Sequence, residues 1–220
     1  MSSHNNRIDI GTLTFVTWNV NGLGSQVKRG KVFSYLKTLS ADIVFLQETH
    51  IKASEQNRLK VNWFSDIYQS TFSSKARGVA ILFRKNVPFQ LSSLTSDPNG
   101  RYLIVSGKIN NIPITCVNVY GPNTDDPEFF RRVFNLLPDP NSTNLIMGGD
   151  YNVFLDSYLD RLSTRPSPPS KASCTMNNLI NSFNLVDIWR IQHPTDKDYS
   201  FFSHAHKSYT RIDFFSLTQS

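Results

Sequence analysis

At positions 145–152 the sequence reads Leu145-Ile146-Met147-Gly148-Gly149-Asp150-Tyr151-Asn152, an apolar run that ends abruptly in polar residues. A short apolar run followed by turn-forming residues predicts a buried strand. The same pattern recurs where apolar runs end at Asn19, Glu48 and Asp213. Because loops at the ends of buried strands carry most functional residues, we expect these side chains to share one site.

The combination of residue types, more than any single residue, indicates the chemistry of that site. Taken singly, a polar strand end or a turn-forming Asn or Asp has an adequate structural explanation. Together, carboxylate and amide oxygens suit Mg²⁺, or Mn²⁺ in its place, which binds one or two carboxylates, water and substrate phosphate. Hydrolysis of a phosphodiester also needs a positioned water and hydrogen-bond donors for the developing charge.

Apolar runs rich in β-branched residues recur along the chain and predict strands. They are Leu13–Val20, Asp42–Gln47, Gly78–Phe83, Arg101–Ile109, Ile112–Tyr120, Asn144–Gly149, Tyr199–Ser203 and Tyr209–Phe215. The fourth and fifth, joined by Asn110-Asn111, predict a hairpin. Three apolar stripes with helical spacing are expected to face the core, and Ser173 is the expected cap of the third. The stripes are Val32, Tyr35, Leu36 and Leu39; Phe130, Val133, Phe134 and Leu137; and Met176, Leu179, Ile180 and Phe183. We therefore expect an α/β (α+β) fold of two packed, mixed, largely antiparallel sheets with helices outside.

The composition favours a polyanionic partner and a packed core. The chain has 220 residues, 39% of them hydrophobic, a formal net charge of +6 and a pI near 9.4. Excess positive charge favours partners such as nucleic acid, although a basic surface alone is an equally good explanation. The two cysteines, Cys116 and Cys174, form no metal-binding spacing. We expect no secretion signal and no membrane partner, because the longest clean apolar stretch, Val79–Phe83, is too short to span a bilayer.

Five segments resemble, in order, the motifs of the exonuclease-endonuclease-phosphatase superfamily. They are Leu13–Leu23, Phe45–His50, Val117–Asn123, Met147–Asn152 and Arg211–Phe215. The chain looks closest to the endonuclease of LINE non-LTR retrotransposons, which is related to apurinic/apyrimidinic endonucleases. This branch is favoured by Gln47–His50, Gly78–Leu82, Tyr199–Ser203 and Ser208–Asp213. The resemblance implies a four-layer α/β sandwich that nicks one strand of double-stranded DNA and leaves a 3′-hydroxyl to prime reverse transcription.

The resemblance also implies a role for each matching polar residue. Glu48 would ligate the metal, with Asn21 beside it where repair relatives carry an Asp. Asp150 would orient or deprotonate the attacking water. Asp213 would orient a catalytic histidine.

Further residues are expected to hold phosphate groups. The resemblance implies that Asn19 and Asn152 hold phosphate oxygens or neighbouring carboxylates. It implies in the same way that Tyr120 contacts the scissile phosphate and that Asn123 is a further phosphate contact.

A third group of residues is expected to contact DNA, and each has a structural alternative. His50 follows the metal-ligand candidate, and a structural hydrogen bond explains it equally well. His204, His206 and Lys207 lie in a segment similar to the hairpin that LINE endonucleases place against the minor groove, although an exposed turn is also adequate. Arg161 belongs to an Asp-Arg pair of the same family, expected near the site.

The sequence departs from the family at its last motif. The family closes with Ser-Asp-His on a last strand, some tens of residues beyond the position that Asp213 matches. No such motif occurs up to Ser220, so we expect the last strand to be missing. His204 or His206 could replace the lost histidine.

The organisation expected from these features is one domain over residues 1–220, with an N-terminal tail at about 1–10. It would act as a monomer and form the N-terminal part of a polyprotein that also carries a reverse transcriptase. We expect cytoplasmic synthesis and a nuclear site of action. Two alternatives stay open: a catalytically impaired DNA-binding domain, and a phosphoesterase of the same fold acting on inositol phosphates or lipids.

Overall fold

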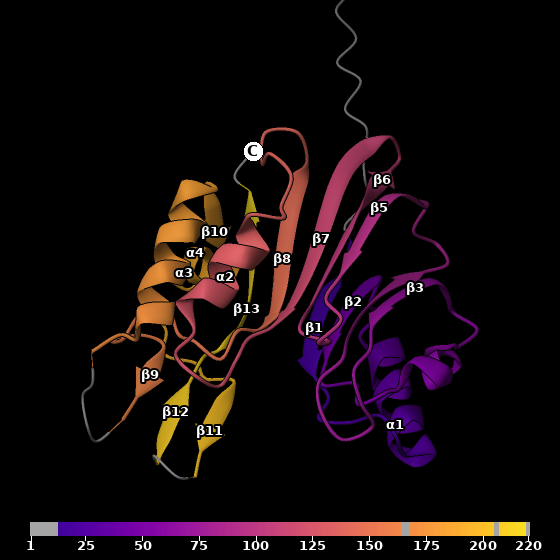
Figure 1. Ribbon diagram of the computed structural model, residues 1–220, viewed down its shortest axis with the longest axis horizontal. Coiled ribbons are helices and arrows are strands. Elements are labelled where there is room, and N and C mark those ends of the chain that lie inside the picture. The colour runs from indigo at the N-terminus through magenta and orange to yellow at the C-terminus, as the bar shows by residue number, and fades with distance from the viewer. Residues whose placement is uncertain (1–12, 164–167, 205–206, 219–220) are drawn as a thin grey trace, which may run out of the picture.

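Two sheets packed face to face form the centre of the molecule (Figure 1). The computed structural model describes residues 13–163, 168–204 and 207–218. The first sheet has the order β1-β2-β4-β3. Its strands are β1 (Phe15–Asn19), β2 (Ile43–Gln47), β4 (Val79–Arg84) and β3 (Phe64–Ser70). Strands β1 and β2 run parallel, and the other pairs are antiparallel.

The second sheet has the order β10-β13-β8-β7-β6-β5. Its strands are β10 (Leu185–Asp187), β13 (Asp213–Thr218), β8 (Asn144–Asp150), β7 (Ile112–Tyr120), β6 (Tyr102–Ile109) and β5 (Phe89–Ser96). Strands β7 and β8 run parallel and the other pairs antiparallel. A small third sheet, in the order β11-β12-β9, projects from one end of the molecule (Figure 1). It consists of β11 (Phe201–Ser203), β12 (Ser208–Thr210) and β9 (Arg161–Leu162).

Helices cover the outer faces of both sheets and complete four layers (Figure 1). The helices are α1 (Gln26–Thr38), a 3₁₀ helix (Ala53–Leu59), α2 (Pro127–Phe134), α3 (Lys171–Ser182) and α4 (Ile188–Gln192). In β2, Val44 and Leu46 pack toward α1, whereas Ile43 and Phe45 pack against the second sheet. All five residues of β2 are therefore buried, as expected for a strand covered on both faces. The predicted fold class is confirmed.

The helix predictions were right about position and partly wrong about faces. In α1, Val32, Phe33 and Leu36 are buried, whereas the predicted core residue Tyr35 is 54% exposed and lies edge-on to Trp18. The cause is the helix rotation, which turns Phe33 toward Trp63 and Phe64. The expected cap Ser173 lies inside α3, and Ser170 caps that helix by accepting from the backbone N–H of Ser173.

Two strand predictions bear on the site. The hairpin between β6 and β7 is confirmed, and its turn residues Asn110 and Asn111 both have positive φ, as a two-residue turn requires. Among the described residues β1 pairs with β2 alone, so its other edge is open and its five residues are half-buried. That the last strand of the family is missing stays a prediction. The described part of the chain holds no helix of the length and hydropathy that crossing a bilayer requires.

Candidate active site

Strand register brings the predicted polar residues together from both sheets. In the second sheet, Tyr120 and Asp213 are both paired with Asp150, so the three residues form a row across β7, β8 and β13. In the first sheet, Asn19 is the last residue of β1 and is paired with Gln47, the last residue of β2. Glu48 follows Gln47 directly in the sequence. The two rows meet at one end of the sandwich.

Asn19 links the two rows directly. Its Nδ2 donates to Glu48 Oε1 at 2.9 Å and to Asp150 Oδ2 at 2.8 Å. Its Oδ1 accepts from the backbone N–H of Asn21 at 3.1 Å. A single amide therefore fixes the separation of a carboxylate on each sheet and reduces the repulsion between them.

The carboxyl groups of Asp150 and Asp213 share a buried setting. Burial, followed by the negative charge of Asp213, raises the pKa of Asp150 to about 7, although hydrogen bonds from Asn19 and from the backbone of Asn152 lower it in part. Burial also raises the pKa of Asp213, and a hydrogen bond with Ser200 opposes the shift. Such a pair can hold and release a proton near neutral pH.

Glu48 lies among three possible hydrogen-bond partners. His50 Nε2 is 3.2 Å from Glu48 Oε2, in addition to the contact from Asn19. The pKa of Tyr120 is raised far above its usual value, mainly by burial. A hydrogen bond to Glu48 and the negative charges of Glu48 and Asp150 raise it further. Tyr120 is thus a neutral hydroxyl beside the carboxylates. The prediction that His50 has a structural hydrogen bond agrees with this contact, and its DNA contact stays a prediction.

Several site residues have left-handed backbone conformations. Glu48, His50, Asn152 and Asn21 have φ values of 52°, 53°, 53° and 43°. Such conformations are uncommon for residues other than glycine and cost free energy, least for Asn. Their concentration at the strand ends indicates that the fold turns these side chains toward a common point.

Gly121 allows β7 and β8 to approach closely at the site. A Cβ on Gly121 would collide with the backbone carbonyl of Tyr151. The carbonyl oxygen of Gly121 accepts from Asn152 Nδ2 at 3.0 Å, and Asp150 Oδ1 accepts from the backbone N–H of Asn152 at 3.0 Å. Asn152 is thereby held in place beside Asp150.

The strand ends that carry Asn19, Glu48, Asp150 and Asp213 line a cavity of about 520 Å³ whose oxygen ligands suit a magnesium ion. Its walls include Asn19, Asn21, Glu48, Asp150 and Asp213. The Glu48 side chain is 21% exposed, so its carboxylate is accessible from the cavity. Among the described residues no cluster of three His, Cys, Asp or Glu side chains could hold a metal. One carboxylate with amide oxygens nonetheless fits Mg²⁺, which keeps several waters and also binds substrate phosphate.

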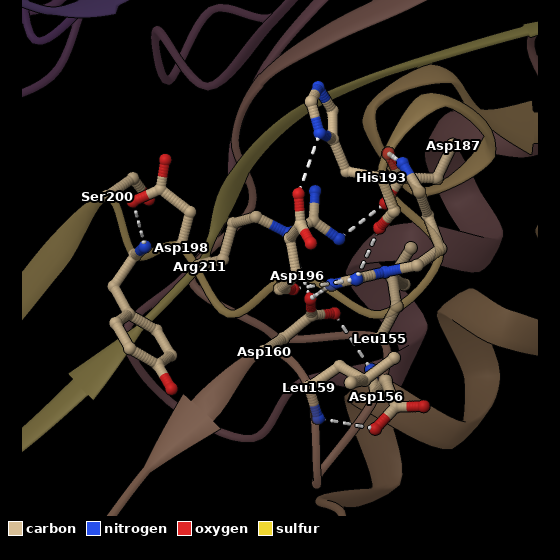
Figure 2. A network of polar contacts seen from close by, with 12 residues as sticks. Leu155, Asp156, Leu159, Asp160, Asp187, His193, Asp196, Asp198, Ser200 and Arg211 are labelled. Atoms are coloured by element: carbon tan, nitrogen blue, oxygen red, sulfur yellow. Dashed lines mark hydrogen bonds and ion pairs between the residues drawn. The ribbon is translucent and has the colours of Figure 1, made fainter.

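A buried ionic network supports the segment that carries Asp213 (Figure 2). Arg211 donates to Asp160 at 2.9 Å and to Asp187 at 2.5 Å, and Arg190 also donates to Asp160 at 2.6 Å. Asp160 is fully buried. Because Arg211 lies two positions before Asp213, these bonds fix where β13 begins. Asp187 therefore has a structural role as the partner of Arg211.

The sequence matches the model of the Endonuclease/Exonuclease/phosphatase family over residues 16–215. The chain belongs to this family. The match covers the strands of both sheets, and hence every strand end that contributes to the site. This confirms the resemblance seen in the sequence motifs.

Proteins similar to this family member include a transposon protein in sequence and two AP endonucleases in fold. The chain is 28% identical over 206 residues to the transposon TX1 uncharacterized 149 kDa protein of Xenopus laevis, covering 91% of this chain and 16% of that protein. Its fold resembles an AP endonuclease from Archaeoglobus fulgidus (TM-score 0.73, 22% identity, 94% and 87% of the two chains). It also resembles the AP endonuclease LMAP from Leishmania major (TM-score 0.72, 18% identity, 94% and 79%).

Two of the predicted DNA contacts, Asn123 and Arg161, lie beside the candidate active site and line a different cavity. Asn123 and Arg161 line a second cavity of about 450 Å³, which Asn152 also lines. Arg161 lies over the ring of Phe154, and its neighbour Asp160 pairs with other arginines, as described above. Asp160 is thus paired with Arg190 and Arg211, and the expected role of Arg161 at the site stays a prediction.

The hairpin residues have a more limited description. His204 contacts the ring of Phe202, and Lys207 has a φ of 47° in the turn between β11 and β12. His206 lies outside the described residues. The roles of all three in binding DNA stay predictions.

Two buried polar residues beneath the site were missed by the sequence reasoning. Gln47 donates to Thr17 at 3.0 Å and to Asn118 at 2.7 Å, and Asn118 donates to the carbonyls of Leu46 and Ala80. These bonds join β7 of one sheet to β1, β2 and β4 of the other. The available signal was a polar side chain inside each of two otherwise apolar runs.

Proposed function

We propose that this family member is a magnesium-dependent endonuclease that nicks one strand of double-stranded DNA and leaves a 3′-hydroxyl as a primer for reverse transcription. The observation that carries the proposal is the bridge from Asn19 to Glu48 and Asp150 at the wall of an open cavity. The net charge of +6 supports a polyanionic substrate over a small phosphate ester.

Each site residue has a proposed part in the reaction. Glu48 holds the metal with Asn21 beside it, and Mn²⁺ can replace Mg²⁺. The bound metal would polarise the scissile phosphate and offset its charge. Asp150 orients the attacking water and accepts its proton, because a pKa of about 7 lets the carboxyl group change protonation near neutral pH.

Phosphate oxygens are bound by neutral donors in this proposal. Tyr120 keeps its proton and donates toward the scissile phosphate, and the Asn152 amide lies beside it. Asn123 binds a neighbouring phosphate along the strand. In this proposal Asp213 orients a catalytic histidine.

One observation favours a second candidate, a DNA-binding domain with impaired nicking. Among the described residues no hydrogen bond joins Asp213 to a histidine, because His50 faces Glu48 and His193 faces Asp196. A phosphoesterase acting on inositol phosphates or lipids is the third candidate, and the positive charge argues against it.

A plasmid-nicking assay with Mg²⁺, run beside a panel of phosphate esters, separates the three candidates. We expect conversion of supercoiled to nicked plasmid, lost on adding a chelator. Asp150→Asn should lower the nicking rate by about 10²- to 10⁴-fold, as for loss of a general base, and Glu48→Gln comparably. The matched control Glu128→Gln removes an exposed carboxylate on α2 and should leave the rate unchanged.

Other outcomes would assign the chain to a different candidate. Salt-sensitive DNA binding without nicking would support the impaired domain. Ester turnover without nicking would overturn the proposal in favour of a phosphoesterase.

The cellular setting is also a proposal. The chain spans 16% of the Xenopus transposon protein that it matches, which supports a place within a longer polyprotein that carries a reverse transcriptase. We propose that the domain acts as a monomer on nuclear DNA after cytoplasmic synthesis.

A further inference from the structure

A third cavity, which Glu48, Asp150 and Asp213 do not line, gathers three arginines. It measures about 340 Å³, and Arg77, Arg101 and Arg132 line it together with Asn99 and Thr124. The arginines come from the loop before β4, the start of β6 and helix α2. Guanidinium groups and neutral hydrogen-bond donors are the usual partners of phosphate oxygens.

Arg77 and Arg101 are held side by side by their backbones. The backbone N–H of Gly78 donates to the carbonyl of Gly100 at 3.0 Å, which joins the loops that carry the two arginines. A Cβ on Gly100 would lie 2.9 Å from the Gly78 nitrogen, so the approach depends on glycine. The nearby charge of Arg77 contributes, after burial, to lowering the pKa of Arg101.

No ion pair neutralises these two arginines: across the described residues no carboxylate oxygen lies within 4.0 Å of a guanidinium nitrogen of Arg77 or Arg101. Asp97 and Asp126 attract Arg101 at longer range and raise its pKa in part, against the larger lowering by burial and Arg77. Both aspartates also hold other groups. Asp97 accepts from the backbone N–H groups of Asn99 and Arg101, and Asp126 caps α2 and pairs with Arg132 at 3.8 Å.

Both arginines are also connected to the proposed catalytic residues. The carbonyl of Arg77 accepts from the backbone N–H of His50 at 2.9 Å, and Arg77 itself has a left-handed φ of 60°. Arg101 donates at 2.9 Å to the carbonyl of Gly121, the same oxygen that accepts from Asn152. Its guanidinium also lies over the ring of Tyr120.

We propose that Arg77 and Arg101 bind a phosphodiester of the DNA that neighbours the scissile one. This inference rests on the proposed function for its substrate class. The bound phosphate lies between two like charges and relieves their repulsion. Because its binding residues are tied to His50 and Gly121, this phosphate sets the register of the strand in the active site.

The test is metal-free binding of the full chain to a short duplex in which single phosphates are replaced by neutral methylphosphonates. For the unmodified protein we expect about a tenfold loss of affinity at one linkage near the nick site, as for the loss of about 1.4 kcal/mol. Arg77→Gln should lower affinity for the native duplex and be insensitive to that same linkage. The slope of log K against log salt should fall by about 0.9 for the lost contact.

Two further variants exclude trivial explanations. Arg131→Gln removes the same charge next to Arg132 on α2, but Arg131 faces Glu128 and Thr175, so its linkage sensitivity should match that of the unmodified protein. Arg77→Lys keeps the charge and should restore most of the salt slope. Thermal unfolding of each variant confirms that it is folded.

The possible failures are distinguishable. The inference is overturned if a methylphosphonate at each linkage weakens binding by Arg77→Gln as much as it weakens binding by the unmodified protein. It is also overturned if Arg131→Gln is insensitive to the same linkage as Arg77→Gln. If the effects of Arg77→Gln and of the single methylphosphonate are coupled but no nicking occurs, this phosphate site is supported and the proposed nicking activity is overturned. Absence of any duplex binding would overturn both.

Discussion

At the scale of single residues, the site depends on amides placed between acids. Asn19 donates to one carboxylate from each sheet, and Asn152 donates to the Gly121 carbonyl while its backbone donates to Asp150. An Asp in either position would add negative charge where carboxylates are already close. The protonation of Asp150 therefore depends on a few hydrogen bonds in a buried setting.

Asp150 should make the metal-free protein less stable as the pH rises. Its folded-state pKa of about 7 lies above the unfolded value of about 3.9, so between these values the folded chain keeps a proton that the unfolded chain has released. The free energy of unfolding therefore falls as pH rises from about 4 to about 7. From pH 5.5 to pH 8 we expect a loss of about 2 kcal/mol, or about 4–8 °C in Tm.

Thermal unfolding in a chelator, at both pH values, measures this effect. Asp150→Asn should remove most of the difference, whereas Asp66→Asn on β3 should keep it, since Asp66 lies outside the site. An equal pH dependence in Asp150→Asn and the unmodified protein would refute the assignment.

At the scale of elements, the segment between β12 and β13 is anchored by charge and not by apolar packing alone. Arg211 and Asp160 are 5% and 0% exposed, and they connect β9, β10, α4 and the start of β13 (Figure 2). Burial alone would lower the pKa of Arg211, but its hydrogen bonds to Asp160 and Asp187 raise it overall. A paired buried charge of this kind becomes costly when one partner is removed.

Arg211→Met should lower the free energy of unfolding by about 3–5 kcal/mol, because it leaves Asp187 buried without its cationic partner. Urea denaturation gives the value. The control Arg58→Met removes a half-exposed arginine paired with Glu55 and should cost at most about 1 kcal/mol. Similar losses in the two variants would show that the network contributes no more than a surface ion pair.

At the scale of the whole molecule, the two sheets are joined by polar as well as apolar contacts. Most of the interface is apolar, for instance Phe45 against Phe215 with ring centroids 5.5 Å apart. Gln47 and Asn118 add fully buried hydrogen bonds directly below the site. Because hydrogen bonds are directional, this pair fixes the sideways position of one sheet on the other, which apolar packing fixes less strictly.

Asn118→Ala should lower the free energy of unfolding by about 1–3 kcal/mol, because it removes buried hydrogen bonds to Gln47 and to the carbonyls of Leu46 and Ala80. In a double-mutant cycle with Gln47→Leu, the losses of unfolding free energy in the two single variants should add up to more than the loss in the double variant. The difference should be about 0.5–3 kcal/mol. Chemical denaturation of the four proteins provides the test. Additive effects would mean that the two side chains act independently.

The fold and the central residues of the site could be predicted from sequence because their signals are local. Apolar runs that end at Asn19, Glu48, Asp150 and Asp213 each lie within a few residues. The partners of Asp160 could not be predicted, since Arg190 and Arg211 are distant in sequence and their approach depends on how α4 packs against β13. The exposed side chain of Tyr35 shows in the same way that apolar residues at helical spacing do not determine which face of the helix is buried.

The juxtaposition of Arg77 and Arg101 had no signal in the sequence. It arises from one backbone hydrogen bond between Gly78 and Gly100, in loops that no periodic pattern describes. Charge in a sequence predicts the class of partner, whereas the position of that charge requires the tertiary structure.

The left-handed backbones of Glu48, His50 and Asn152 set limits on which substitutions this domain can accept. A valine or isoleucine at any of the three positions meets a steric barrier regardless of its chemistry. Glycine at position 48 would relax the chain by roughly 1–2 kcal/mol while removing the proposed metal ligand. Under the proposed function, selection for heat resistance alone should therefore favour glycine at this position, and selection for DNA nicking should retain the glutamate.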